Sequence, residues 1–421
     1  MAAEAGDAPR KSFLGFLKSI GPGLITGASD DDPSGVATYS QAGAQFGLLT
    51  LWTALITFPL MAAVQEMCAR IGLVTEQGLT GILRRTYPAP VLWLMVLFSF
   101  PAIVLNIGAD IAGMGAVAHL VLPQVSSLTW SVGFTGVILL AIIWLPYQKF
   151  AAVLKWLCAA LLVYLITPFL VHTDWPQVAR RTFLPTFRWD ADFLSMLVAI
   201  LGTTISPYLF FWQATMEVEA VKQKKLRVDK RVIEAMGLDV DLGMLFSNVV
   251  MFFIILTTGT VLFNAGIHRI DTVEQAAQAM RPLAGPAAYY LFALGIVGTG
   301  FLAIPVLAGS LSYLVAEAFD WRQGLDRKLH EAPAFYAVLI VAVLIGLGIN
   351  YTQIGAVRAL IWSAILYGLT APVVIAIVLH IANNRKVMGD YVNGVWSNIF
   401  GGLAFALMTA AAGLLVWFQF H

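Results

Sequence analysis

Three consecutive aspartates followed by a proline are the residues whose types and spacing point most directly to chemistry. Asp30, Asp31 and Asp32 interrupt a long apolar stretch, and Pro33 follows them directly. An aspartate before a proline is a favoured helix N-terminus, so capping explains Asp32 but leaves its two neighbours without a role. The run therefore predicts binding of a cation or a proton, and Asp32 can cap a helix as well.

A second short polar segment interrupts a later apolar stretch. Thr203, Thr204 and Ser206 stand directly before or beside Pro207, whose ring frees a backbone carbonyl. Hydroxyl, carbonyl and carboxylate oxygens are hard ligands that suit Mg²⁺, Ca²⁺ or Mn²⁺, and the segment holds no Cys, Met or His. Small hydroxyl residues also pack where membrane helices meet, which is the alternative. Together with the aspartates, the hydroxyls favour a cation site.

A single carboxylate, Asp110, lies in another apolar stretch, within the segment 106–113. A lone buried carboxylate is readily neutralised. Two interpretations remain open for Asp110: it carries protons, or it is a silent hydrogen-bonding group.

Composition identifies the elements that must position these residues. Of 421 residues, 59% are hydrophobic and 12% charged, and the apolar runs have the length of membrane helices. A bilayer offers the backbone no hydrogen-bond partner, so the sequence predicts an all-α polytopic bundle. The net charge of +1 gives no indication of nucleic-acid binding. Two cysteines and six scattered histidines form no disulfide framework or ligand spacing.

Eleven membrane spans are predicted from the apolar windows. They are placed at 15–46, 48–73, 90–121, 128–146, 149–172, 193–222, 235–263, 284–319, 333–350, 353–382 and 395–419. The first and sixth are broken by the two polar segments, five spans apart. This is typical of 5+5 inverted-repeat transporters, whose substrate lies between the broken helices. The predicted site is therefore between residues 29–35 and 203–208.

The spans divide the chain into four parts. Residues 1–14 form a tail, 15–172 the first five-helix repeat, 193–382 the second, inverted repeat, and 395–419 an additional helix. The tail and alternate loops hold 18 of the 25 Lys and Arg, and the opposite loops hold 5. Because basic residues favour the cytoplasmic side, this pattern predicts a plasma (inner) membrane protein with a cytoplasmic N-terminus.

The segment from Gly21 to Ala44 resembles the first helix of the Nramp divalent-metal transporters, and the resemblance extends through all eleven spans. It implies the fold of the inverted-repeat amino-acid transporters and proton-coupled uptake of manganese or iron. Carried over by residue, the family's metal-binding aspartate is Asp32, and a carbonyl ligand falls on Ser29.

Other positions depart from the family pattern. Gly35 stands where the family has asparagine, Ser206 where it has methionine, and Tyr208 and Gln213 where it has histidines. On the third span only Asp110 matches the family's acidic residues. Loss of the methionine thioether removes a soft ligand that favours transition metals. The sequence thus looks like a divergent branch, similar to Nramp-related magnesium transporters.

The sequence predicts a secondary transporter of a divalent cation, with Mg²⁺ or Mn²⁺ favoured, working by alternating access. The predicted site residues are Asp32, Ser29, Thr203, Ser206, Asp31 and Gly35, with Asp110 on a proton pathway. No cofactor is expected besides the ion as substrate, and no obligate protein partner. The first alternative is a transporter of a small organic solute such as an amino acid. The second alternative is a sensor or receptor on the same fold. An enzyme is not expected, because the sequence shows no nucleophile–base pair or cofactor motif.

Overall fold

The computed structural model describes residues 22–145, 163–224, 228–352 and 354–420, and within these ranges the chain is helical without any strand. The helices in the predicted spans are α2 (Pro22–Asp30) with α3 (Pro33–Phe46), α4 (Trp52–Thr75), α6 (Ala89–Val121), α7 (Ser127–Trp144), α9 (Val163–Leu170), α11 (Ala191–Thr204) with α12 (Pro207–Lys224), α13 (Lys230–Val261), α16 (Ala288–Phe319), α17 (Pro333–Ile349), α18 (Ala356–Asn383) and α20 (Val395–Phe420). Eight described segments are long and apolar enough to cross a membrane. The predicted tail, 1–14, and much of the fifth span lie outside the described residues.

Short helices that the sequence did not predict fill several connections. They are α5 (Leu79–Thr86), α10 (Trp175–Phe183), α14 (Val273–Ala277), α15 (Arg281–Ala284) and α19 (Arg385–Met388), with 3₁₀ turns at Gly47–Thr50, Gln278–Met280, Gly285–Ala287 and Gly389–Tyr391. Local capping explains one of them: Thr272 and Gln275 form a reciprocal capping box at the start of α14. These segments are too short to register as membrane spans.

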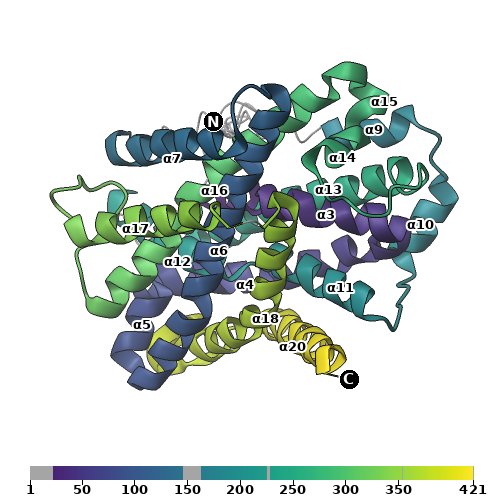
Figure 1. Ribbon diagram of the computed structural model, residues 1–421. Coiled ribbons are helices and arrows are strands. Elements are labelled where there is room, and N and C mark those ends of the chain that lie inside the picture. Colours follow the sequence, from purple (N-terminus) through teal and green to yellow (C-terminus); the bar gives the residue numbers. More distant parts are fainter. Residues whose placement is uncertain (1–21, 146–162, 225–227, 353, 421) are drawn as a thin grey trace, which may run out of the picture.

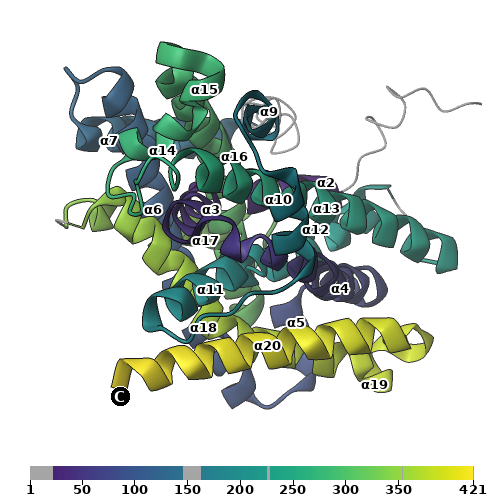
Figure 2. The same ribbon diagram turned by 90° about the vertical axis from the view of Figure 1, so that its right-hand side faces the viewer.

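The broken helices lie inside the bundle. In both ribbon views α3 lies near the centre, whereas α20 runs along the edge (Figure 1, Figure 2). Helix α13 packs against α2, α3 and α4, while α6 packs against α16 and α18. The peripheral α20 contacts α18, α4 and α11. The polar segments of the first and sixth spans are therefore surrounded by protein rather than lipid, as irregular backbone at membrane depth requires.

Both breaks occur where proline prevents the helix from continuing. Helix α2 ends at Asp30 and α3 begins at Pro33, while α11 ends at Thr204 and α12 begins at Pro207. Proline is well suited to the first position of a helix because its missing N–H would have no intrahelical partner there. Each proline thus ends one half-helix and starts the next, which confirms the broken first and sixth spans.

Close helix contact brings α11 against α18 beside the second break. A β-carbon added to Gly202 would lie 2.7 Å from the Cα of Gly368. Neither backbone could approach so closely with larger side chains, and small residues are the usual means of close packing between membrane helices. This contact fixes the end of α11 next to the site.

Candidate metal centre

The Asp32 carboxylate lies at the first break and is almost completely buried, with 2% of its surface exposed. Its Oδ1 accepts a hydrogen bond of 2.7 Å from the Gly35 backbone N–H, so Asp32 caps α3. Its Oδ2 accepts a 2.8 Å bond from Nδ2 of Asn106 on α6. Capping, one of the two roles expected for this residue, is confirmed, and it uses only one of the two carboxylate oxygens.

The other two aspartates face a different helix. The Ser247 hydroxyl on α13 donates to Oδ2 of Asp30 at 2.6 Å and lies 3.4 Å from Oδ1 of Asp31. The remaining oxygen of each carboxylate, Asp30 Oδ1 and Asp31 Oδ2, is buried without a hydrogen-bond partner in the described structure. The three carboxylates therefore diverge: Asp32 points toward α6, and Asp30 and Asp31 toward α13.

The two breaks are joined by a tyrosine. The Tyr208 hydroxyl, on the first turn of α12, donates to the Ser29 carbonyl at 2.9 Å. At the second break Ser206 donates to the Thr203 carbonyl at 2.6 Å. A β-carbon on Gly35 would lie 3.4 Å from the Thr203 hydroxyl oxygen, so α3 and α11 approach closely here. The predicted residues Ser29, Gly35, Thr203 and Ser206 thus gather around the two breaks.

The remaining predicted residue, Asp110, lies one helical turn after Asn106 on α6. Its side chain is fully buried, and neither carboxylate oxygen has a hydrogen-bond partner among the described residues. In the described ranges no three His, Cys, Asp or Glu side chains converge as a ready metal cluster. A cation at the breaks would therefore depend on one carboxylate, hydroxyls, carbonyls and its own water, which is a hard donor set.

Several residues of this polar network were not predicted from the sequence. They are Asn106 on α6, Ser363 on α18, Ser247 on α13 and the hydroxyl of Tyr208. Asn106 and Ser363 each stand within strongly apolar helices, so an isolated polar residue in a membrane span was the available signal. This signal does not indicate which helix the side chain faces. That information comes only from the packing of the helices.

The two ends of α16 border different pockets. One end contributes Phe292 to a pocket of about 20 Å³ that also includes Pro33 and Ile270 and is lined by apolar side chains. At the other end, Glu317 lines a polar pocket of about 500 Å³ together with Lys222 and residues of α4 and α5. The pocket beside Pro33 is therefore small and apolar on the side of α14, and the larger polar pocket includes no residue of either break.

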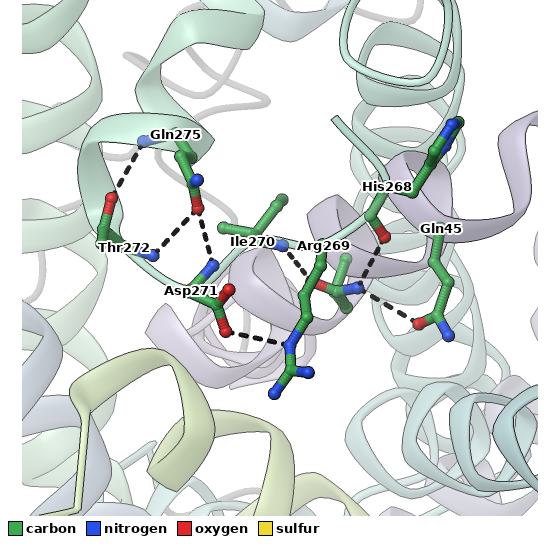
Figure 3. Close-up of polar contacts among 8 residues, drawn as sticks. Gln45, His268, Arg269, Ile270, Asp271, Thr272 and Gln275 are labelled. Atoms are coloured by element: carbon green, nitrogen blue, oxygen red, sulfur yellow. Dashed lines mark hydrogen bonds and ion pairs between the residues drawn. The ribbon is translucent and has the colours of Figure 1, made fainter. Parts of the chain in front are cut away.

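A loop covers this apolar side. Figure 3 shows the segment from His268 to Gln275 beside Gln45 of α3. The neighbouring Gln41, also on α3, accepts a 2.8 Å hydrogen bond from the Ile270 backbone N–H. Its amide nitrogen lies 3.1 Å from Oε1 of Gln45 and 3.4 Å from the His268 carbonyl. Helix α3 thereby holds Ile270 in the apolar pocket above Pro33.

An exposed ion pair joins α5 to the other end of α16. Arg84 on α5 lies 2.9 Å from a carboxylate oxygen of Asp320, which follows α16 directly. The hydrogen bond and positive charge of the guanidinium lower the pKa of Asp320. Nearby, the Glu317 carboxylate accepts a 2.9 Å bond from the Gly81 N–H in the first turn of α5. Two acidic groups thus anchor α5 to α16.

A polytopic helical bundle with two spans broken at a shared, buried polar centre defines a membrane transporter of the 5+5 inverted-repeat class. The chain belongs to the Nramp family, since the family model described as "Natural resistance-associated macrophage protein-like" matches residues 23–418. The resemblance seen in the sequence and its assignment to a transporter rather than an enzyme are confirmed.

Individual relatives agree with this assignment. The divalent metal cation transporter MntH of Verminephrobacter eiseniae is 25% identical over 417 residues, covering 97% of this chain and 90% of that protein. The manganese transporter of Eremococcus coleocola, solved with an aromatic bis-isothiourea compound, superposes with a TM-score of 0.75 at 17% identity, covering 97% of this chain and 87% of that chain. The structure of MhsT in complex with L-phenylalanine superposes with a TM-score of 0.64 at 13% identity, covering 98% of this chain and 99% of that chain. At these identities the solved structures show the fold alone.

Proposed function

We propose that this protein transports a divalent cation across the plasma membrane by alternating access, and that Mg²⁺ or Mn²⁺ is its substrate. The observation that carries the proposal is the buried Asp32 carboxylate at the meeting point of two broken helices. A carboxylate in the membrane interior is costly unless a cation or polar partners compensate it. The relatives named as divalent metal cation transporters support the choice of ion class.

Asp32 is proposed as the central ligand, with oxygens from Ser29, Thr203 and Ser206 completing the site. Gly35 contributes the close approach of α3 to α11 rather than a side chain. The Asp31 carboxylate points toward Ser247 on α13 rather than toward α6. It is therefore proposed to add negative charge near the ion without binding it directly. The Tyr208 hydroxyl now bonded to the Ser29 carbonyl would have to move, or to share that oxygen with the ion.

The donor set favours a hard ion. Mg²⁺ releases its water reluctantly and is usually held by one or two carboxylates with several waters retained. One ionised carboxylate among hydroxyls and carbonyls fits Mg²⁺ or Mn²⁺, whereas a softer transition metal would gain little from a site without sulfur or imidazole. We propose Asp110 as the residue that carries protons if transport is proton-coupled.

Two further parts of the proposal concern the whole chain. Residues 15–172 and 193–382 are proposed as the two inverted repeats, with 395–419 as an added helix. The N-terminus is proposed to be cytoplasmic, which places α5 inside and the α13–α14 loop outside. The positive charge of Arg84, Arg85 and Lys222 around the polar pocket supports this orientation.

The test is uptake into proteoliposomes of the purified protein. Mg²⁺, Mn²⁺ and Ca²⁺ are compared with a panel of amino acids, and an internal pH reporter follows protons. The proposal predicts saturable divalent flux, with Mg²⁺ or Mn²⁺ preferred, that Asp32→Ala abolishes. Amino-acid flux without any divalent flux would instead establish the organic-solute alternative. If divalent flux acidifies the lumen, Asp110→Asn should remove the acidification; no pH change would exclude proton coupling.

A further inference from the structure

The side chain of Asn106 is the one group on α6 that contacts the Asp32 carboxylate through a hydrogen bond in the described structure. Asn106 is fully buried, and its Nδ2 lies 2.8 Å from Oδ2 of Asp32. A buried amide is costly unless both of its ends are bonded. Its Oδ1 meets this requirement by accepting a 2.8 Å bond from the Ser363 hydroxyl on α18.

The bond to Asp32 determines which way the amide faces. An ionised carboxylate only accepts hydrogen bonds, so it requires the NH₂ end of Asn106. The Ser363 hydroxyl can donate its single proton to the oxygen end, and it also lies 2.7 Å from the Leu360 carbonyl and 3.3 Å from the Ser34 hydroxyl. A flipped amide would set its oxygen against the carboxylate. Asp32 therefore sets the orientation of the amide, and Ser363, whose hydroxyl can donate or accept, bonds its other end.

The Asp32 carboxylate is consequently held by donors from two elements. The Gly35 N–H of α3 bonds Oδ1, and the Asn106 amide of α6 bonds Oδ2. Each carboxylate oxygen can accept more than one hydrogen bond or ligand, so both keep capacity for an ion or its water. With both oxygens held, the plane of the carboxylate is fixed before the ion arrives.

We propose that Asn106 positions the Asp32 carboxylate for cation binding and that Ser363 holds the other end of the Asn106 amide in place. This inference rests on the proposed function, because it assigns Asn106 and Ser363 to the same cation site. Groups that hydrogen-bond to metal ligands fix the geometry of those ligands, and their loss typically weakens metal binding by roughly 10–100-fold. The affinity of the site for the cation thereby depends on the position of α18, which carries Ser363.

A purely structural role for Asn106 makes a different prediction. Polar side chains commonly join membrane helices, and on that basis the loss of Asn106 would reduce thermal stability without altering ion affinity. Asn248 on α13 provides a matched control. It is also a buried amide between helices, and its Oδ1 accepts a 2.9 Å bond from the Thr57 hydroxyl on α4, but no hydrogen bond joins it to Asp32.

The experiment measures KM for Mg²⁺ uptake and the rise in Tm on addition of Mg²⁺ for the wild-type protein, Asn106→Ala, Ser363→Ala, the double variant and Asn248→Ala. Asn106→Ala is expected to raise KM by roughly 10–100-fold and to reduce the Mg²⁺-induced Tm rise. Ser363→Ala should raise KM by about fivefold, the effect of one hydrogen bond. The double variant should match Asn106→Ala, because Ser363 acts through the amide.

Several results would overturn the proposal while leaving the proposed function intact. One such result is that the wild-type protein transports Mg²⁺ and the KM of Asn106→Ala stays within twofold of the wild-type KM. Another is an equal rise in KM for Asn248→Ala. If Asn106→Ala does not fold, Ser363→Ala decides the question, and an unchanged KM there contradicts the role of the amide. Absence of divalent flux in the wild-type protein contradicts the proposed function itself.

Discussion

The Asp32 carboxylate has two hydrogen-bond partners in the protein, and the transported ion is proposed as its third partner. It caps α3 through the Gly35 N–H and accepts a second bond from Asn106. Asp30 ends α2 and faces Ser247 together with Asp31, whereas the extended backbone at Asp32 directs its carboxylate toward Asn106 on α6. Which face each carboxylate takes depends on the dihedral angles at the break, and composition does not specify them.

Ser206 is the residue whose replacement should change the ion preference most clearly. Its hydroxyl bonds the Thr203 carbonyl at 2.6 Å, at the position where the family resemblance places methionine. Ser206→Met adds a thioether, which binds Mn²⁺ more favourably than Mg²⁺. The ratio of Mn²⁺ to Mg²⁺ uptake should therefore rise, by on the order of tenfold. A ratio unchanged from the wild-type protein would show that residue 206 does not face the ion.

At the scale of the elements, the positions of the spans could be predicted because long apolar runs have few alternatives in a bilayer. The predicted breaks coincide with Pro33 and Pro207. Helix α5 was not predicted, because eight residues with two arginines resemble an ordinary loop. It is held by tertiary contacts with Glu317 and Asp320, which no local pattern reveals.

The contact between α11 and α18 gives a prediction about stability. A β-carbon at Gly202 would lie 2.7 Å from the Gly368 Cα, so Gly202→Ala must push the two helices apart. Overpacking of this kind costs about 1–3 kcal/mol of unfolding free energy. Thermal unfolding should show a Tm lower by several degrees. Gly413→Ala on α20 is the control, since a β-carbon there meets nothing within 4 Å, and an equal loss in both variants would contradict the packing argument.

The ion pair between α5 and α16 gives a prediction about pH. Because Arg84 lowers the pKa of Asp320, the pair stabilises the folded protein at neutral pH, and this contribution is lost as pH falls through the lowered pKa. Asp320→Asn should therefore have a lower Tm than the wild-type protein at pH 7 and the same Tm once Asp320 is protonated. Asparagine suits the left-handed backbone of residue 320, whose φ is 58°. A Tm difference that persists at low pH would assign it to another cause.

At the scale of the whole molecule, the described structure is narrow and apolar at the α14 end and opens a polar pocket at the α5 end. Alternating access requires the narrow end to open at another stage of transport. Apolar periodicity in the sequence places the helices in a membrane but does not distinguish an open end from a closed one. That distinction lies in contacts between distant segments, such as Gln41 with Ile270.

Gln41 should control opening at the narrow end. Gln41→Leu removes the acceptor for the Ile270 N–H, a loss of about 1 kcal/mol. Hydrogen exchange at the Ile270 amide should accelerate by about fivefold, while exchange in the core of α16 stays unchanged. Gln124→Leu, on an exposed loop, serves as the control. Unchanged exchange in Gln41→Leu would show that the loop is held by its apolar contacts alone.

A divalent cation is proposed to pass through the break of the first span with Asp32 as its ligand. The most direct test is Mg²⁺ and Mn²⁺ flux in proteoliposomes of the wild-type protein and Asp32→Asn. Asparagine caps a helix as well as aspartate does, so the variant should keep α3 while losing the charge. Asp229→Asn is the matched control, because Asp229 caps α13 through the Val232 N–H at an exposed position. Flux lost only in Asp32→Asn is the predicted result, and wild-type flux in that variant would contradict the role of Asp32 as the ligand.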